Sequence, residues 1–188
     1  MNEIKGESAG NEVLQCVQLL TMYLSTAPDE SIINEAKTIL VTKKASLNQH
    51  PDICILLGTL FTLHGLYDDA LHALSFCLKD PECAGLAVQV YCLINRMDLA
   101  IDLMEYTKQL AGPESYQAQI MESWVAIARG DPIKIDEAFY LYEELAATYP
   151  TSSKASCAKA ICFLQSKRFQ DADDFLVEAL NKVLDLLS

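Results

Sequence analysis

The sequence contains no apolar run long enough to cross a membrane, because its longest runs, ICILLGTLF and AGLAVQVYCLI, fall well short of the roughly 18 residues that a span requires. Basic residues are also scarce: 14 Lys and Arg stand against 26 Asp and Glu, which gives a formal net charge of −12. A surface of that sign repels phosphate backbones and anionic lipids. We therefore expect no direct nucleic-acid binding and no direct membrane insertion, and the acidity favours a basic partner.

A targeting segment and an Asn-x-Ser/Thr acceptor site are also absent from the sequence. The opening residues, MNEIKGESAG, carry two glutamates and no apolar core, so they predict neither a secretory signal nor a transit peptide. The seven cysteines are an odd number, which argues against a disulfide framework. We expect a cytoplasmic protein whose cysteines are small, reduced core residues.

The apolar residues recur with helical spacing, and Pro, Gly, Asp and Asn separate the apolar stretches. This pattern predicts an all-α fold with few or no strands. A flexible N-terminus is expected at residues 1–10 and a single helical repeat domain at 11–188. The predicted helices are 11–25, 30–43, 51–64, 67–78, 84–94, 97–110, 114–129, 135–148, 152–166 and 169–186.

The second helix of each predicted pair opens with a similar phrase: LYDDALHALSFCL, RMDLAIDLMEYTK, KIDEAFYLYEELA and RFQDADDFLVEAL. The shared alanines follow one another at steps of 34, 30, 38 and 34 residues. A mean step of 34 is typical of the tetratricopeptide repeat. The prediction is an α-α superhelix, a tetratricopeptide-like solenoid of about five helix pairs. A helical bundle with coincidental alanines is the alternative. The anchor alanines are Ala36, Ala70, Ala100, Ala138 and Ala172.

The pair from Asp52 to Pro81 fits this repeat best. Small residues at Gly58 and Ala70 should let its two helices approach closely, while the large Leu74 fills the gap between pairs. The two irregular steps need separate explanations. We expect a long turn at residues 130–134 to account for the 38-residue step, and a shortened first helix for the 30-residue step.

No local string supports catalysis. Gly6-Glu7-Ser8-Ala9-Gly10 matches the nucleophile elbow of hydrolases, but the elbow needs a preceding strand and only five residues stand before it. The cysteines and histidines lack the compact spacing of metal ligands. The carboxylate groups, such as Glu143-Glu144, fall where acids usually form a solvated face. We therefore predict no enzyme activity, no catalytic residue, no metal and no cofactor.

The binding surface is expected on the first helices of the pairs, which line the groove of a tetratricopeptide array and commonly hold a partner peptide. Any of these positions could instead belong to the core, and Trp124 is expected to be a packing residue rather than part of the surface. The predicted partner-binding residues are Ile55, Thr59, Thr62, Gln89, Cys92, Leu93, Ile161 and Gln165.

Several phrases resemble the coatomer subunit epsilon family, the tetratricopeptide subunits of the COPI coat. The most specific phrase is ESWVAIARGDPIKIDEAFYLYEELAATYP. The resemblance extends over most of the chain through four further phrases: QCVQLLTMYLS, LHGLYDDALHAL, VQVYCLINRMDLAIDLM and CFLQSKRFQDADDFLVEALNK. Members of that family carry an additional N-terminal pair and continue past the segment that matches ALNK. The resemblance therefore implies a chain shorter than usual members.

The resemblance implies a non-enzymatic scaffold subunit that binds the C-terminal region of alpha-COP in its groove and contacts other coatomer subunits. It also implies peripheral association with Golgi membranes and COPI vesicles through the coat, in retrograde Golgi-to-ER and intra-Golgi transport. The alternative is an unrelated tetratricopeptide adaptor of the chaperone-cofactor kind. Such an adaptor would need Lys, Arg and Asn on the groove, where the positions here are mostly neutral.

Overall fold

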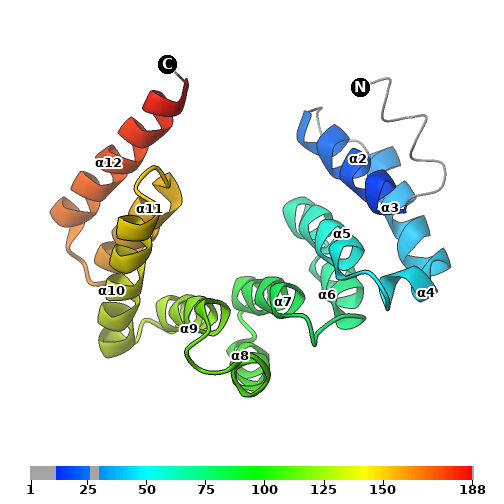
Figure 1. The fold of residues 1–188 in the computed structure, drawn as a ribbon, viewed down its shortest axis with the longest axis horizontal. Coiled ribbons are helices and arrows are strands. Elements are labelled where there is room, and N and C mark those ends of the chain that lie inside the picture. The colour runs from blue at the N-terminus through cyan, green and yellow to red at the C-terminus, as the bar shows by residue number, and fades with distance from the viewer. Residues whose placement is uncertain (1–11, 26–29, 188) are drawn as a thin grey trace. The chain divides into compact units, whose positions relative to one another are not determined.

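The computed structural model describes residues 12–25 and 30–187, and the regular secondary structure in these ranges is entirely helical (Figure 1), which confirms the all-α prediction. By its contacts the chain forms two compact units, Met1–Ala111 and Gly112–Ser188, called unit 1 and unit 2 below. Unit 1 contains α2 (Glu12–Ser25), α3 (Glu30–Thr42), α4 (Lys44–Leu47), α5 (Pro51–His64), α6 (Tyr67–Ser75), α7 (Pro81–Leu93) and α8 (Met97–Ala111). Unit 2 contains α9 (Tyr116–Arg129), α10 (Pro132–Thr148), α11 (Ser153–Gln165) and α12 (Phe169–Leu187).

Consecutive helices pack as pairs in both units. In unit 1, α5 packs against α6 and α7 against α8, and α7 also contacts both helices of the preceding pair. In unit 2, α9 packs against α10 and α11 against α12, and α11 also packs on α10. The α5–α6 pair and the α9–α10 pair are thus each covered by the first helix of the next pair in the same unit, as expected for a repeat whose units bury their apolar faces against their neighbours.

The core of unit 1 contains the close helix contact predicted from small residues. Gly58 and Ala70 are buried, and Leu74 has no exposed surface. A Cβ atom added at Gly58 would lie 2.9 Å from the Cγ and Cδ2 atoms of Leu74. The glycine is therefore required by the volume of Leu74, which packs against the other helix of its own pair, whereas the sequence predicted it between pairs.

The turns inside four of the pairs share one geometry. Gly65, Asn95, Gly130 and Lys167 each have a positive φ, between 57° and 83°. The amide that follows each of them donates to a carbonyl five residues back, for example Leu66 N to Phe61 O at 2.8 Å. This is the helix-ending arrangement in which glycine is the preferred residue. The two non-glycine turns consequently hold a backbone conformation that costs a lysine or asparagine free energy.

The explanations offered for the two irregular steps are wrong. α10 begins at Pro132, with Asp131 accepting hydrogen bonds from the amides of Ile133 and Lys134, so residues 132–134 are an added helical turn and not part of a loop. Proline is favoured in this first position because its missing N–H needs no partner there. The 30-residue step arises from α6, a second helix of only 9 residues, while the first helix α7 keeps 13. The irregularities therefore lie in the second helices.

Smaller differences concern the ends of elements. The four-residue helix α4 was not expected, and α7 starts at Pro81 rather than at Ala84 because Asp80 caps it, accepting from the amides of Glu82 and Cys83. The predicted flexible N-terminus and the Gly6–Gly10 string lie outside the described residues. That 11–188 act as a single domain stays a prediction.

Candidate partner-binding surface

Three of the predicted binding residues share one side of α5. Ile55, Thr59 and Thr62 follow one another at spacings of four and three, which places them on a single helix face, and all three are half-buried. The buried residues of α5, such as Leu57 and Phe61, occupy the opposite side. The Thr62 hydroxyl donates to the Gly58 carbonyl oxygen at 2.7 Å. Its hydrogen is therefore used within the helix, and its methyl group is the part of the side chain that can contact a partner.

The neighbouring first helix, α7, carries the next three. Gln89 and Cys92 are half-buried, and Leu93 is 61% exposed. Burial raises the pKa of the Cys92 thiol, so this cysteine is protonated at neutral pH and offers an apolar contact rather than a nucleophile. Because α7 packs directly on α5, these residues belong to two adjacent helices. We call the set the first-helix surface of unit 1; its members are Ile55, Thr59, Thr62, Gln89, Cys92 and Leu93.

The remaining two predicted residues are in unit 2. Ile161 and Gln165 are one turn apart on α11; Ile161 is 43% exposed and Gln165 is also exposed. Five of the eight predicted residues are half-buried and three are exposed, and Ile55 packs against the hydrophobic core of unit 1, as the alternative of a core position expected for some of them. Their role in binding a partner stays a prediction.

Sequence reasoning missed one residue of this surface. Leu63 of α5 is 54% exposed and follows Thr59 by four residues, so it extends the same side of the helix toward its C-terminus. That spacing is the signal that could have identified it, since Leu93 follows Gln89 at the same distance on α7. With Leu63 included, the side chains of the surface are apolar or neutral.

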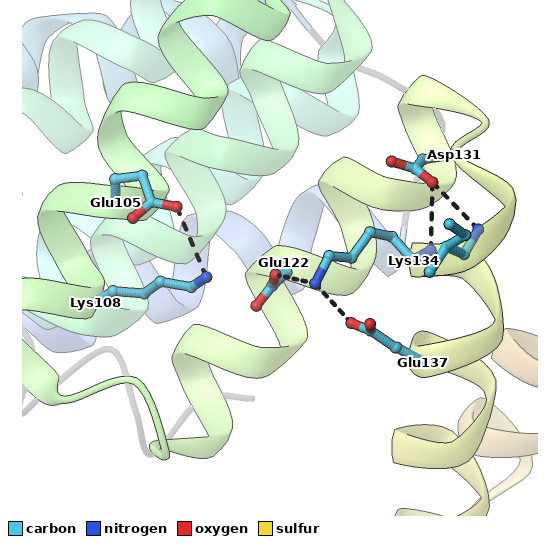
Figure 2. A network of polar contacts seen from close by, with 7 residues as sticks. Glu105, Lys108, Glu122, Asp131, Lys134 and Glu137 are labelled. Atoms are coloured by element: carbon cyan, nitrogen blue, oxygen red, sulfur yellow. Dashed lines mark hydrogen bonds and ion pairs between the residues drawn. The ribbon is translucent and has the colours of Figure 1, made fainter.

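Three of the pockets in the described part of the chain hold no arrangement suited to acid–base chemistry. One, of about 190 Å³, lies between α9 and α10 and brings Lys134 near Ser123. Figure 2 shows Lys134 held by Glu137 at 2.7 Å and Glu122 at 3.2 Å, and the hydrogen bond to Glu137 is the main reason that the pKa of Lys134 is raised. A lysine held as a cation cannot serve as a general base at neutral pH.

A second pocket in unit 2, of about 280 Å³, is lined by aromatic residues of α10 and α11. The guanidinium carbon of Arg168 lies 4.5 Å from the centroid of the Phe163 ring, and the same side chain donates to Asp171 at 2.8 Å. A pocket of about 580 Å³ in unit 1 adjoins Cys77 and Asp80, but Asp80 is occupied in capping α7. Arg168 and Asp80 thus already have structural partners in these two pockets.

Within residues 12–25 and 30–187, no group of three or more His, Cys, Asp and Glu side chains is placed to hold a metal ion. The cysteines are free, and four of them are buried. Burial raises the pKa of Cys16 and Cys54 to about 12 and that of Cys162 to about 11. The buried thiols are therefore protonated packing residues, as expected from their apolar sequence neighbours.

Among the described helices, none combines the length and the apolar composition that crossing a membrane requires. Trp124, expected to be a packing residue, is half-buried on α9, where it interacts with the buried Tyr142 of α10.

The family model described as coatomer epsilon subunit matches residues 1–185 of this chain. The chain belongs to the coatomer epsilon subunit family. The coatomer subunit epsilon of Dictyostelium discoideum is 30% identical over 171 residues, which are 88% of this chain and 55% of that protein. The coatomer subunit epsilon-1 of Arabidopsis thaliana is 30% identical over 178 residues, which are 94% of this chain and 59% of that protein.

This member of the epsilon subunit family therefore spans little more than half the length of the curated relatives that it matches. The resemblance seen in the sequence is confirmed. The family is one of coat subunits and not of enzymes, in agreement with the prediction that the chain is not an enzyme.

Solved structures support the fold of this epsilon subunit family member. A crystal structure of MamA aligns with a TM-score of 0.51 and 18% identity, covering 84% of this chain and 90% of that one. A second MamA structure aligns with a TM-score of 0.52 and 19% identity, covering 92% of each chain. At such low identity the likeness shows the tetratricopeptide-like fold alone.

Proposed function

We propose that this chain acts as a non-enzymatic scaffold subunit of the COPI coat and binds the C-terminal region of alpha-COP through the first-helix surface of unit 1. Membership of the coatomer epsilon family is the observation that carries the proposal. The composition of this surface also supports binding of an apolar partner segment, because Leu63 and Leu93 are exposed apolar side chains and the other members are neutral. Exposed apolar residues gathered on one side of two adjacent helices are typical of a protein-binding site.

The exposed residues of α11 form a second part of the proposed site. Ile161 and Gln165 lie one turn apart on a first helix, as Gln89 and Leu93 do in unit 1. In this proposal other coatomer subunits are reached through alpha-COP, and the chain is peripheral on Golgi membranes and COPI vesicles by way of the coat.

An unrelated tetratricopeptide adaptor of the chaperone-cofactor kind is the alternative. Its clamp for a peptide carboxylate would require Lys, Arg or Asn side chains. The first-helix surface of unit 1 instead presents Thr59, Thr62 and Gln89 among aliphatic residues, with no cation among its members. This composition favours an apolar partner segment over a carboxylate terminus.

A pull-down from cytosol with this chain as bait, read by mass spectrometry, tests the proposal. The bait variant Thr59→Glu with Gln89→Glu places two charges on the surface and should lose the coatomer subunits that the unmodified chain recovers, alpha-COP first among them. The matched control is Thr38→Glu with Gln109→Glu, because it makes the same changes at exposed positions of the second helices α3 and α8. This control should recover coatomer normally.

Two results would overturn the proposal. Recovery of chaperones in place of coatomer would favour the adaptor, and recovery of no coatomer by a bait with the circular dichroism of a folded helical protein would remove the coat assignment. Equal recovery by the two double variants would leave coat membership intact and refute the first-helix surface as the binding site.

A further inference from the structure

Three cysteines of unit 1 gather where α4, α5 and the turn after α6 meet. The Cys54 thiol of α5 donates to the Leu47 carbonyl oxygen at 3.3 Å, and the Cys77 thiol donates to the same oxygen at 3.0 Å. The Cys83 thiol of α7 donates to the Pro51 carbonyl oxygen at 3.7 Å. Two thiols that share one acceptor atom lie close to each other, so Cys54 and Cys77 form a pair that does not include Cys83.

The two paired thiols also interact directly. Burial is the main cause of the raised pKa of the Cys54 thiol, and a hydrogen bond between the Cys54 and Cys77 side chains raises that pKa further. The two cysteines are 23 residues apart in the sequence, and Cys77 lies beyond the end of α6, at Ser75. Their proximity is therefore a product of the folded pair and not of neighbouring positions along the chain.

The members of the pair differ in their access to solvent. Cys54 has no exposed surface, whereas Cys77 is half-buried and lines the pocket of about 580 Å³ in unit 1. A pocket of this volume is large enough for a small peptide, so a low-molecular-weight disulfide such as oxidised glutathione can reach the Cys77 sulfur. Because thiol–disulfide exchange depends on access, Cys77 is the thiol that reacts first and Cys54 is the one that reacts second.

We propose that Cys54 and Cys77 are a reversible redox switch, in which oxidised glutathione converts the two thiols into a disulfide that links α5 to the turn after α6. The Cys77 thiolate attacks one sulfur of oxidised glutathione, which forms a mixed disulfide and releases one glutathione. The Cys54 thiolate then attacks the Cys77 sulfur and releases the second glutathione. The two thiol protons pass to the departing glutathione thiolates, and an excess of reduced glutathione reverses both steps. The second step is the slower one, because burial keeps Cys54 protonated.

Oxidation changes the contacts that hold this part of unit 1 together. In the reduced chain, the Leu47 carbonyl oxygen at the end of α4 accepts from both thiols. The disulfide has no hydrogen to donate, so α4 loses this contact with α5. The new covalent bond closes a loop between α5 and the turn before α7, which restrains the unfolded chain. We expect oxidation to raise the thermal midpoint and to speed hydrogen exchange in residues 44–50. This inference does not depend on the proposed function.

Trypsin digestion tests the switch, because residues 45–79 form one tryptic peptide whose cysteines are Cys54 and Cys77. The whole chain is equilibrated with mixtures of reduced and oxidised glutathione, quenched with acid, alkylated with N-ethylmaleimide in denaturant and digested. The disulfide should leave peptide 45–79 unalkylated and lighter than the reduced peptide by two hydrogen atoms. Peptide 80–96, which contains Cys83 and Cys92, should be alkylated at both. The equilibrium constant for the disulfide should be at least about tenfold larger in the native chain than in urea, since the fold holds the two thiols together.

The matched control is Cys83→Ala, which removes the neighbouring buried thiol and should change the equilibrium constant less than about twofold. Cys54→Ala should stop the reaction at the mixed disulfide on Cys77, and Cys77→Ala should prevent both steps. Full alkylation of peptide 45–79 at every glutathione ratio would overturn the inference, and this result needs no variant. So would a disulfide between peptides 45–79 and 80–96, or a lower thermal midpoint in the oxidised chain.

Discussion

The α5–α6 pair and the α11–α12 pair have the same residue pattern and different packing. Ala70 and Ala172 are buried at the same place, yet Leu74 is fully buried and Leu176 is nearly half exposed. The pattern therefore determines how two helices of a pair meet, while the exposure of the large side chain depends on packing that the pattern does not specify. A repeat sequence specifies the first property locally and the second only through its neighbours.

The contacts inside the two pairs also differ. The α5–α6 pair is held by aliphatic residues and by the close approach of Gly58 to Leu74. The α11–α12 pair includes stacked rings of Phe163 and Phe175, with the Lys159 ammonium 4.3 Å from the Phe175 centroid. We expect the α5–α6 pair to be more sensitive to the loss of Leu74 than the α11–α12 pair is to the loss of Leu176, because truncating a fully buried side chain loses both transfer and cavity free energy.

Truncating the two equivalent leucines should produce the largest difference. Leu74→Ala leaves a cavity in a fully buried site and should lower the free energy of unfolding by about 2–5 kcal/mol. Leu176→Ala removes a side chain that water already reaches, and its cost should be about 1 kcal/mol or less. Urea denaturation followed by circular dichroism measures both. Equal costs would mean that the two pairs are covered alike in solution.

The two aspartate caps offer a smaller comparison. Asp80 accepts from two amides of α7 at 3.0 Å each, and Asp131 accepts from two of α10 at 3.2 and 3.4 Å. Asp80→Ala and Asp131→Ala should each cost about 1 kcal/mol, with the larger loss at Asp80, where the bonds are shorter. Thermal unfolding compares the variants with Asp80→Asn and Asp131→Asn, which should retain most of the stability. A loss of stability with Asn equal to that with Ala would contradict the capping role.

The turns inside the pairs should respond in opposite directions to glycine and lysine. Lys167 has a φ of 59°, whereas the equivalent Gly65 has a φ of 83°. Lys167→Gly relieves the strained backbone and should raise the free energy of unfolding by up to about 1 kcal/mol, while Gly65→Lys should lower it by about as much. Replacing the exposed Lys154 by glycine is the control for loss of a charge, and it should not stabilise the protein.

The smallest effect concerns the carboxylate that links α11 to α12. The hydrogen bond from Lys182 is the main cause of the lowered pKa of Glu178, whose ordinary value is 4.5. A lowered folded-state pKa stabilises the protein above the unfolded-state pKa, and this contribution is lost as the pH falls through the folded-state value. The stability difference between the unmodified chain and Lys182→Met should therefore be a few tenths of a kcal/mol at pH 7 and vanish as the pH falls through the lowered folded-state pKa of Glu178. A difference that grows at low pH would contradict this assignment.

Helical spacing, the anchor alanines and the small-to-large contact at Gly58 could be predicted from sequence, because each depends on residues within one pair. The start of α10 could have been predicted too, since Asp131-Pro132 is a cap followed by a first-turn proline. The exposure of Leu176 could not, because its pattern is that of the buried Leu74. The eight predicted surface residues are exposed or half-buried, since helical spacing puts them away from the fully buried side of their helices.

Binding of the purified C-terminal region of alpha-COP to the whole chain, measured by isothermal titration calorimetry, tests the central claim most directly. We predict saturable binding that Thr59→Glu with Gln89→Glu abolishes and that Leu180→Glu, at an exposed position of α12, leaves unchanged within about twofold. The absence of binding by the folded chain, or equal binding by the double variant, would contradict the claim that the first-helix surface of unit 1 holds this partner.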